Sequence, residues 1–146
     1  MKEDIRLYTG EDMTEEVLSL QARSVIDFSA TYDVFDSKEG IKIGALQRKG
    51  MKSMLRDEWN VLDAYDNPIG IIQEDSMGLA LVRRFLANIV PQNYDMIVNG
   101  VKAVDLKQEF NPFVYKLNVE YITNAIDQRI GIAAGILIAT IEGRQN

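Results

Sequence analysis

The chain has 146 residues, of which 47% are hydrophobic and 26% are charged, as is typical of a single folded domain. Its formal net charge of −6 argues against a nucleic-acid partner, because general nucleic-acid binding relies on a basic surface. Cysteine and histidine are absent, which excludes disulfides, thiolate or imidazole metal ligands and a histidine general base. We expect no metal site and no cofactor.

The start of the chain is acidic. Residues 1–16 carry six acidic and two basic side chains with few large apolar residues, so we interpret them as a loosely held lead-in. They lack the basic start and apolar run of a secretion signal, and we expect a cytoplasmic protein with one domain over residues 17–146.

Alternating apolar and polar residues then predict a series of antiparallel hairpins. The segments Tyr32–Asp36 and Ile43–Gln47 resemble Trp59–Asp63 and Ile69–Gln73, which indicates a weak internal repeat of one hairpin. A third copy has the turn Asn99-Gly100, the strongest short hairpin signal. The predicted strands cover residues 26–34, 41–45, 59–63, 69–73, 94–98, 101–106 and 115–121.

Two helices interrupt or follow these strands. Residues 77–90 have apolar side chains at helical spacing, and Pro91 would end that short helix. A second helix is predicted over residues 125–142, with Asn124 as its N-cap and Gly143 as its C-cap.

The second helix is apolar on every side, so it must be enclosed by protein or lipid. Its unbroken apolar part, Ile130 to Ile141, is shorter than the roughly 20 residues of a membrane span, which favours a buried core helix. On this interpretation, aspartate at Ile132 or Ile136 would abolish soluble folded protein, because it would bury an unpaired charge.

Several segments resemble the tubby C-terminal-like superfamily, and its LURP-one-related branch in particular, which also groups with phospholipid scramblases. They are the hairpins of the form aromatic-x-V-x-D, the segments RRFLANIVPQNYD and FNPFVYKLNV, and the closing DQRIGIAAGILIATIEGRQ. The most specific parts are Asn111-Pro112-Phe113 and the C-terminal apolar helix.

The resemblance covers residues 17–146 and implies a closed, antiparallel β-barrel of twelve strands around a buried C-terminal helix. The residues agree with that fold, because a closed sheet has no free edge and the apolar helix would fill the lumen. In tubby proteins the domain binds phosphoinositide headgroups, and in scramblases the helix is proposed to contact lipid. The basic residues of the tubby phosphoinositide pocket cannot be mapped onto this sequence.

One basic cluster is the candidate binding site. Arg48, Lys49, Lys52 and Arg56 lie in a stretch with no acidic residue between Leu46 and Arg56, and anionic lipid surfaces attract such clusters. The alternative is a solvated loop between two hairpins. Arg83-Arg84 on the predicted short helix is a weaker candidate, for which the exposed face of an amphipathic helix is the favoured interpretation.

Acidic residues gather at the predicted turns, as at Asp36 and Asp63, where aspartate commonly forms the turn itself. Acid–base catalysis or Ca²⁺ binding is the alternative for them, and we expect no catalytic residue. The aromatic side chains are expected to pack in the barrel wall and not to form a ligand platform; they are Tyr32, Trp59, Phe110 and Phe113.

From these observations we expect a non-enzymatic binding or scaffold module, with an anionic lipid or membrane surface as the first candidate partner. A protein-interaction or oligomerisation module without lipid affinity is the second hypothesis. A carboxylate-dependent enzyme is the third.

Overall fold

The computed structural model of the chain describes residues 2–24, 30–49, 58–75, 91–109, 111 and 113–142. Nine strands within them form one antiparallel sheet whose order follows the sequence, and a helix follows the last strand. The elements are β1 (Asp4–Thr9), β2 (Glu15–Ala22), β3 (Thr31–Asp36), β4 (Ile41–Arg48), β5 (Glu58–Leu62), β6 (Pro68–Glu74), β7 (Asn93–Val98), β8 (Val101–Glu109), β9 (Lys116–Tyr121) and α2 (Gln128–Glu142).

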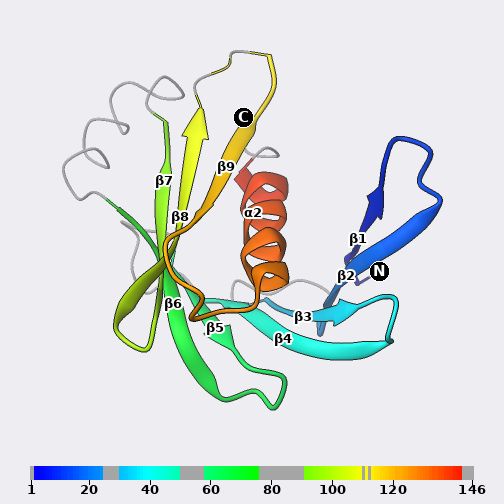
Figure 1. Cartoon of the computed structure of the whole chain (residues 1–146), viewed down its shortest axis with the longest axis horizontal. Coiled ribbons are helices and arrows are strands. Elements are labelled where there is room, and N and C mark those ends of the chain that lie inside the picture. Colours follow the sequence, from blue (N-terminus) through cyan, green and yellow to red (C-terminus); the bar gives the residue numbers. More distant parts are fainter. Residues whose placement is uncertain are drawn as a thin grey trace.

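The sheet curls around α2, with β7 to β9 on one side of the helix and the β1–β2 hairpin on the other (Figure 1). The mainly β chain with a C-terminal helix is therefore confirmed. In the part of the chain that the structure describes, β1 and β9 are the two ends of the sheet, and the sheet is open between them. The twelve strands and the closure of the expected barrel are not seen in these residues.

The first four hairpins share one irregularity, which explains how the sheet curls. In each of them the second strand carries one extra residue close to the turn, a β-bulge that bends the strand and increases its twist. The extra residues are all apolar and are Val17, Ile43, Ile69 and Ala103. The repeat predicted for three hairpins thus extends to a fourth.

The additional copy of the repeat is the first hairpin of the chain, β1–β2. The acidic composition of residues 1–16 had predicted a loosely held segment here, and the structure shows two paired strands instead. Ile5 pairs with Leu20 and Leu7 with Leu18, and Ile5 packs against the hydrophobic core. The repeat signal was present in the sequence, because Val17, Leu20 and Gln21 correspond to Ile43, Leu46 and Gln47, 26 residues later. The acidic residues that precede Val17 made this segment resemble a solvated tail, although the apolar positions of the repeat are present.

Equivalent positions of the repeated hairpins build the core in layers. Each second strand contributes one large aliphatic side chain that is almost completely buried: Leu20, Leu46, Ile72 and Leu106. The strands β3, β5 and β7 each contribute one buried aromatic ring, from Tyr32, Trp59 and Tyr94 respectively. These layers enclose the buried side of α2, which includes Ile130, Ala133, Ala134, Leu137 and Ile138.

The helix begins at Gln128, three residues later than predicted, so Asn124 is not its N-cap. Asp127 is the cap: its Oδ1 accepts a hydrogen bond of 2.9 Å from the backbone N–H of Arg129. Arg129 pairs with Asp127 and also with Asp36 at the end of β3, so it ties the start of α2 to a distant hairpin. The predicted helix over residues 77–90 and the predicted C-cap Gly143 lie outside the described residues.

Two glycines bring α2 close to β9. A Cβ atom on Gly131 would lie 2.6 Å from the hydroxyl oxygen of Tyr121, and one on Gly135 would lie 3.0 Å from a methyl carbon of Val119. A neighbouring side of the helix is less enclosed than predicted, because Ile132 is 39% exposed. Within the described residues, no helix has the length and apolarity needed to cross a membrane.

Gly131→Ala tests the close contact between α2 and β9. At an exposed helical position this change would stabilise the protein by about 1 kcal/mol. Here the added methyl group collides with the Tyr121 ring, and we expect the free energy of unfolding to fall by about 2 kcal/mol in urea denaturation. Tyr121→Leu should relieve part of that loss in a double-mutant cycle, whereas a stabilised Gly131→Ala variant would contradict the packing.

Aspartate substitutions on α2 should destabilise the protein strongly at a buried position and weakly at an exposed one. Leu137→Asp buries an unpaired charge and should abolish soluble folded protein. Ile132→Asp, which the sequence predicts to be equally harmful, should leave a folded protein that loses about 1 kcal/mol, because position 132 reaches solvent. Soluble yield and thermal melting measure both, and equal behaviour of the two variants would contradict this orientation of α2.

Candidate functional site

The two ends of the sheet differ in how the strands are connected. Tight turns at residues 10–14, 37–40, 63–67 and 99–100 join the strands at one end. At the other end the connections cover residues 23–30, 49–57, 75–92 and 110–115. We call this second end the connection end. Binding residues of rigid scaffolds are found most often in such longer connections.

Arg48 and Lys49, two of the four basic residues of the candidate site, lie where β4 leaves the sheet at the connection end. The guanidinium carbon of Arg48 is 5.9 Å from the centre of the Trp59 ring, within cation–π range. Lys49 forms an ion pair with Glu58, and its backbone N–H donates a 2.9 Å hydrogen bond to the Glu58 carbonyl. Lys52 and Arg56 lie outside the described residues.

The aromatic side chains predicted to pack in the barrel wall do not all do so. Tyr32 and Trp59 are buried with their ring centres 6.4 Å apart, which confirms that they pack in the wall of the sheet. Phe113 was predicted to do the same, and this is wrong, because its side chain is 91% exposed. Phe110 lies outside the described residues.

A network of four charged residues, which sequence reasoning missed, links three hairpins. The Arg23 guanidinium donates to both carboxylate oxygens of Asp33 at 2.6 to 3.1 Å and also pairs with Asp66. Lys42 Nζ lies 2.9 Å from Asp33 Oδ1 and 2.7 Å from Asp66 Oδ1. Arg23 follows β2 and Asp66 lies in the β5–β6 turn, so only the folded sheet brings these residues together.

The network keeps its carboxylates ionised. Burial raises the pKa of Asp33, but hydrogen bonds from Arg23 and Lys42 outweigh it, and the pKa is lowered overall. Hydrogen bonds from Lys42 and Arg23 likewise lower the pKa of Asp66. Burial opposes the charge of Lys42, yet the contacts with Asp66 and Asp33 raise its pKa above the usual value. These groups stabilise one another and are poor proton donors at neutral pH.

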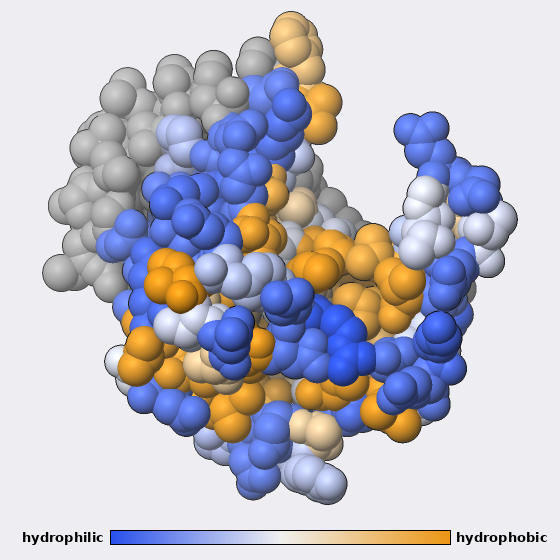
Figure 2. Space-filling view, viewed as in Figure 1, coloured by the Kyte–Doolittle hydropathy of each residue, from blue (hydrophilic) through white to orange (hydrophobic). Residues whose placement is uncertain are grey.

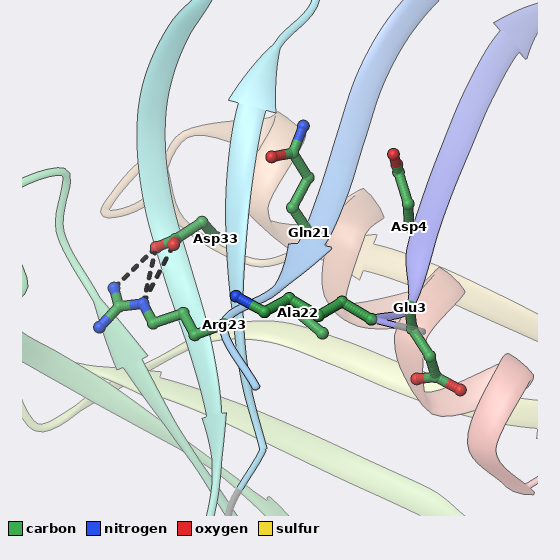
Figure 3. Close-up of a pocket in the computed structure, with 7 residues that line it drawn as sticks. Glu3, Asp4, Gln21, Ala22, Arg23 and Asp33 are labelled. Carbon is green, nitrogen blue, oxygen red and sulfur yellow. Dashed lines mark hydrogen bonds and ion pairs between the residues drawn. The ribbon is translucent and has the colours of Figure 1, made fainter. Parts of the chain in front are cut away.

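A cavity of about 460 Å³ lies beside this network, where β1, β2 and β3 meet. Among the described residues that line it, Ala22 alone is apolar, unlike the mostly apolar walls of small-molecule sites. Arg23 turns toward Asp33, whereas the carboxylate of Glu3 points away from that pair (Figure 3). We see no convergent set of groups in this cavity that would orient a substrate.

The turn carboxylates have structural roles. Asp36 Oδ1 accepts hydrogen bonds from the backbone N–H groups of Lys38 and Glu39, and Asp63 accepts from the backbone of Tyr65 and Asn67. The pKa values of seven carboxyl groups are lowered, those of Glu16, Asp33, Asp36, Asp63, Asp66, Asp105 and Asp127. A general acid needs the opposite shift. Within the described residues, no group of acidic side chains is arranged to hold a metal ion.

Comparison with known proteins finds no match to a protein-family model, to a curated protein or to a solved structure. The relation to the tubby C-terminal-like superfamily therefore continues as a proposal.

Asp33→Asn tests the charged network through its pH dependence. The pKa of Asp33 is lower in the folded than in the unfolded state, so the unfolded state takes up the proton first as the pH falls below about 4. The stabilisation by Asp33 is thus complete above that pH and is lost as the pH falls through the folded pKa. We expect Asp33→Asn to cost about 1.5 kcal/mol at pH 7 and to match the parent near pH 2.

Urea denaturation at both pH values measures this difference. Glu11→Gln, in the exposed β1–β2 turn, is the control and should follow the parent at both values. A constant difference between Asp33→Asn and the parent at all pH values would show that the loss is one of packing and not of ionisation.

Proposed function

We propose that the chain is a non-enzymatic binding module of the tubby C-terminal-like superfamily, in its LURP-one-related branch, that associates with anionic membrane surfaces in the cytoplasm. The closed twelve-stranded barrel is part of this proposal. The repeated hairpins wrapped around an apolar C-terminal helix support it, because that arrangement is what the resemblance implies.

The observation that carries the lipid proposal is the position of the basic cluster. On a chain with a net charge of −6, Arg48 and Lys49 leave β4 at the connection end, and the sequence adds Lys52 and Arg56 before β5 begins. Each basic residue near an anionic surface contributes about 1 kcal/mol of attraction. This local charge offsets the general repulsion between an acidic protein and such a surface.

The ion pair between Lys49 and Glu58 is compatible with lipid binding. The Lys49 and Glu58 side chains are 40% and 30% exposed, and an exposed ion pair contributes only about 0 to 1 kcal/mol. Lys49 can therefore exchange the carboxylate for a lipid phosphate at little cost. Arg48 has a different role, because its contact with Trp59 joins β4 to β5.

A catalytic function has less support. The turn carboxylates of the described residues accept backbone hydrogen bonds, and the carboxyl groups with shifted pKa values are held ionised. Neither arrangement suits proton transfer by these carboxyl groups at neutral pH.

The open ends of the sheet favour one alternative, a protein-interaction or oligomerisation module without lipid affinity. β1 and β9 each pair with one neighbour among the described strands, and an open sheet edge can accept a strand from another chain. Charged residues on both strands, such as Arg6 and Lys116, discourage unspecific pairing.

Co-sedimentation with vesicles tests the lipid proposal. We expect binding to vesicles of phosphatidylcholine with phosphatidylserine, weakened by salt, and no binding to phosphatidylcholine alone. Lys49→Glu should weaken binding about thirtyfold at low salt, because it changes the local charge by two units.

Lys38→Glu is the matched control, since Lys38 is exposed in the β3–β4 turn at the opposite end of the sheet and the net charge changes equally. It should bind nearly as the parent does. No binding of the parent to anionic vesicles at low salt would reject the lipid proposal in favour of a protein partner.

A further inference from the structure

The connection from β8 to β9 presents two adjacent apolar side chains to solvent. Phe113 is 91% exposed and Val114 is 57% exposed, whereas the strands that flank the connection bury or half-bury large apolar residues such as Leu106 and Val119. Single exposed apolar residues are common on protein surfaces. Two in succession, one of them an almost fully exposed phenylalanine, form a distinct apolar tip.

A local turn holds this tip in place. Asn111 Oδ1 accepts hydrogen bonds from the backbone N–H groups of Phe113 and Val114, at 2.9 and 3.1 Å. An asparagine side chain that bonds to the backbone two residues ahead is a standard turn former. The shape of the tip therefore does not depend on burying Phe113, and both apolar side chains are presented in a defined arrangement.

The tip lies in the β8–β9 connection, which is one of the longer connections, and Arg48 and Lys49 lie where another of them leaves β4. Figure 2 shows apolar surface projecting from the molecule at the far end of the β8–β9 connection, with no wall around it. Behind the tip, Glu109 and Lys116 face each other across β8 and β9, so the flanking charges balance.

The geometry favours a lipid bilayer over a protein as the partner of the tip. Two protruding side chains cover far less than the roughly 1,000 Å² of a stable protein interface. The interfacial region of a bilayer accepts shallowly inserted phenylalanine and aliphatic side chains without a preformed pocket. The balanced charges of Glu109 and Lys116 allow an anionic surface to come close.

We propose that Phe113 and Val114 are an apolar membrane anchor that inserts into the interfacial region of the bilayer. This inference rests on the proposed association with anionic membranes and adds a second contribution to it. The basic cluster attracts the surface through charge and weakens with salt, whereas the anchor contributes through burial and does not.

Phe113→Trp reports directly on insertion. The chain has one tryptophan, Trp59, which is 3% exposed and gives a constant buried signal. We expect the emission of Phe113→Trp, after subtraction of the parent spectrum, to shift to shorter wavelength when vesicles of phosphatidylcholine with phosphatidylserine are added. Tyr65→Trp is the matched control, because Tyr65 is 87% exposed in the β5–β6 turn at the opposite end, and it should not shift.

Phe113→Ala gives the corresponding affinity. We expect binding to the same vesicles to weaken about tenfold at low and at physiological salt alike, with an unchanged melting temperature, because the side chain is exposed in the folded protein. The effect of Lys49→Glu should shrink as the salt concentration rises.

The outcomes separate the anchor from the proposed function. If the parent binds anionic vesicles while Phe113→Ala binds equally well and Phe113→Trp does not shift, the anchor is overturned and membrane association stands. An equal shift of Tyr65→Trp also overturns the anchor. If the parent binds no vesicles, membrane association and the anchor fail together.

Discussion

The backbone of α2 approaches the inner face of β9 through Gly131 and Gly135, which meet Tyr121 and Val119 with no room for a side chain between them. A helix that is apolar nearly all round has to be covered, and the sheet covers it by curling. The β-bulge of each of the first four hairpins produces this curl, because an extra residue bends and twists its strand. The apolar helix is thus buried by the curled sheet, and the inner face of the sheet is buried by the helix.

The repeated hairpins also separate two kinds of connection, short turns within each hairpin and longer segments between hairpins. The turns within the four bulged hairpins all lie on one side of the sheet because each hairpin repeats the same direction, and the longer connections follow on the other side. The turns are held by aspartate side chains and by residues with positive φ, such as Asn99 and Gly100, and have little freedom to vary. Both proposed contributions to membrane binding come from the longer connections or from the strand end beside one of them.

Charged side chains on the strands and charged side chains in the longer connections have different partners. On the sheet, Asp33, Lys42, Asp66 and Arg23 satisfy one another and hold neighbouring hairpins together. At the connection end, Lys49 has one exposed carboxylate partner that it can exchange. In the proposed membrane association, the basic residues attract the anionic surface, and the exposed apolar tip adds burial that salt does not screen.

The sequence by itself determined the elements whose signals are local. Alternation predicted β3 to β9 apart from their exact ends, the Asn99-Gly100 pair predicted its turn, and the apolar run predicted the C-terminal helix. It also contained the 26-residue repeat that includes β1–β2, although acidic neighbours masked that copy. Only the tertiary structure decided that Ile132 and Phe113 reach solvent and that Arg23 meets Asp66. Exposure and ion pairing depend on which distant strands surround a side chain, whereas alternation and turn chemistry depend on its neighbours in the chain.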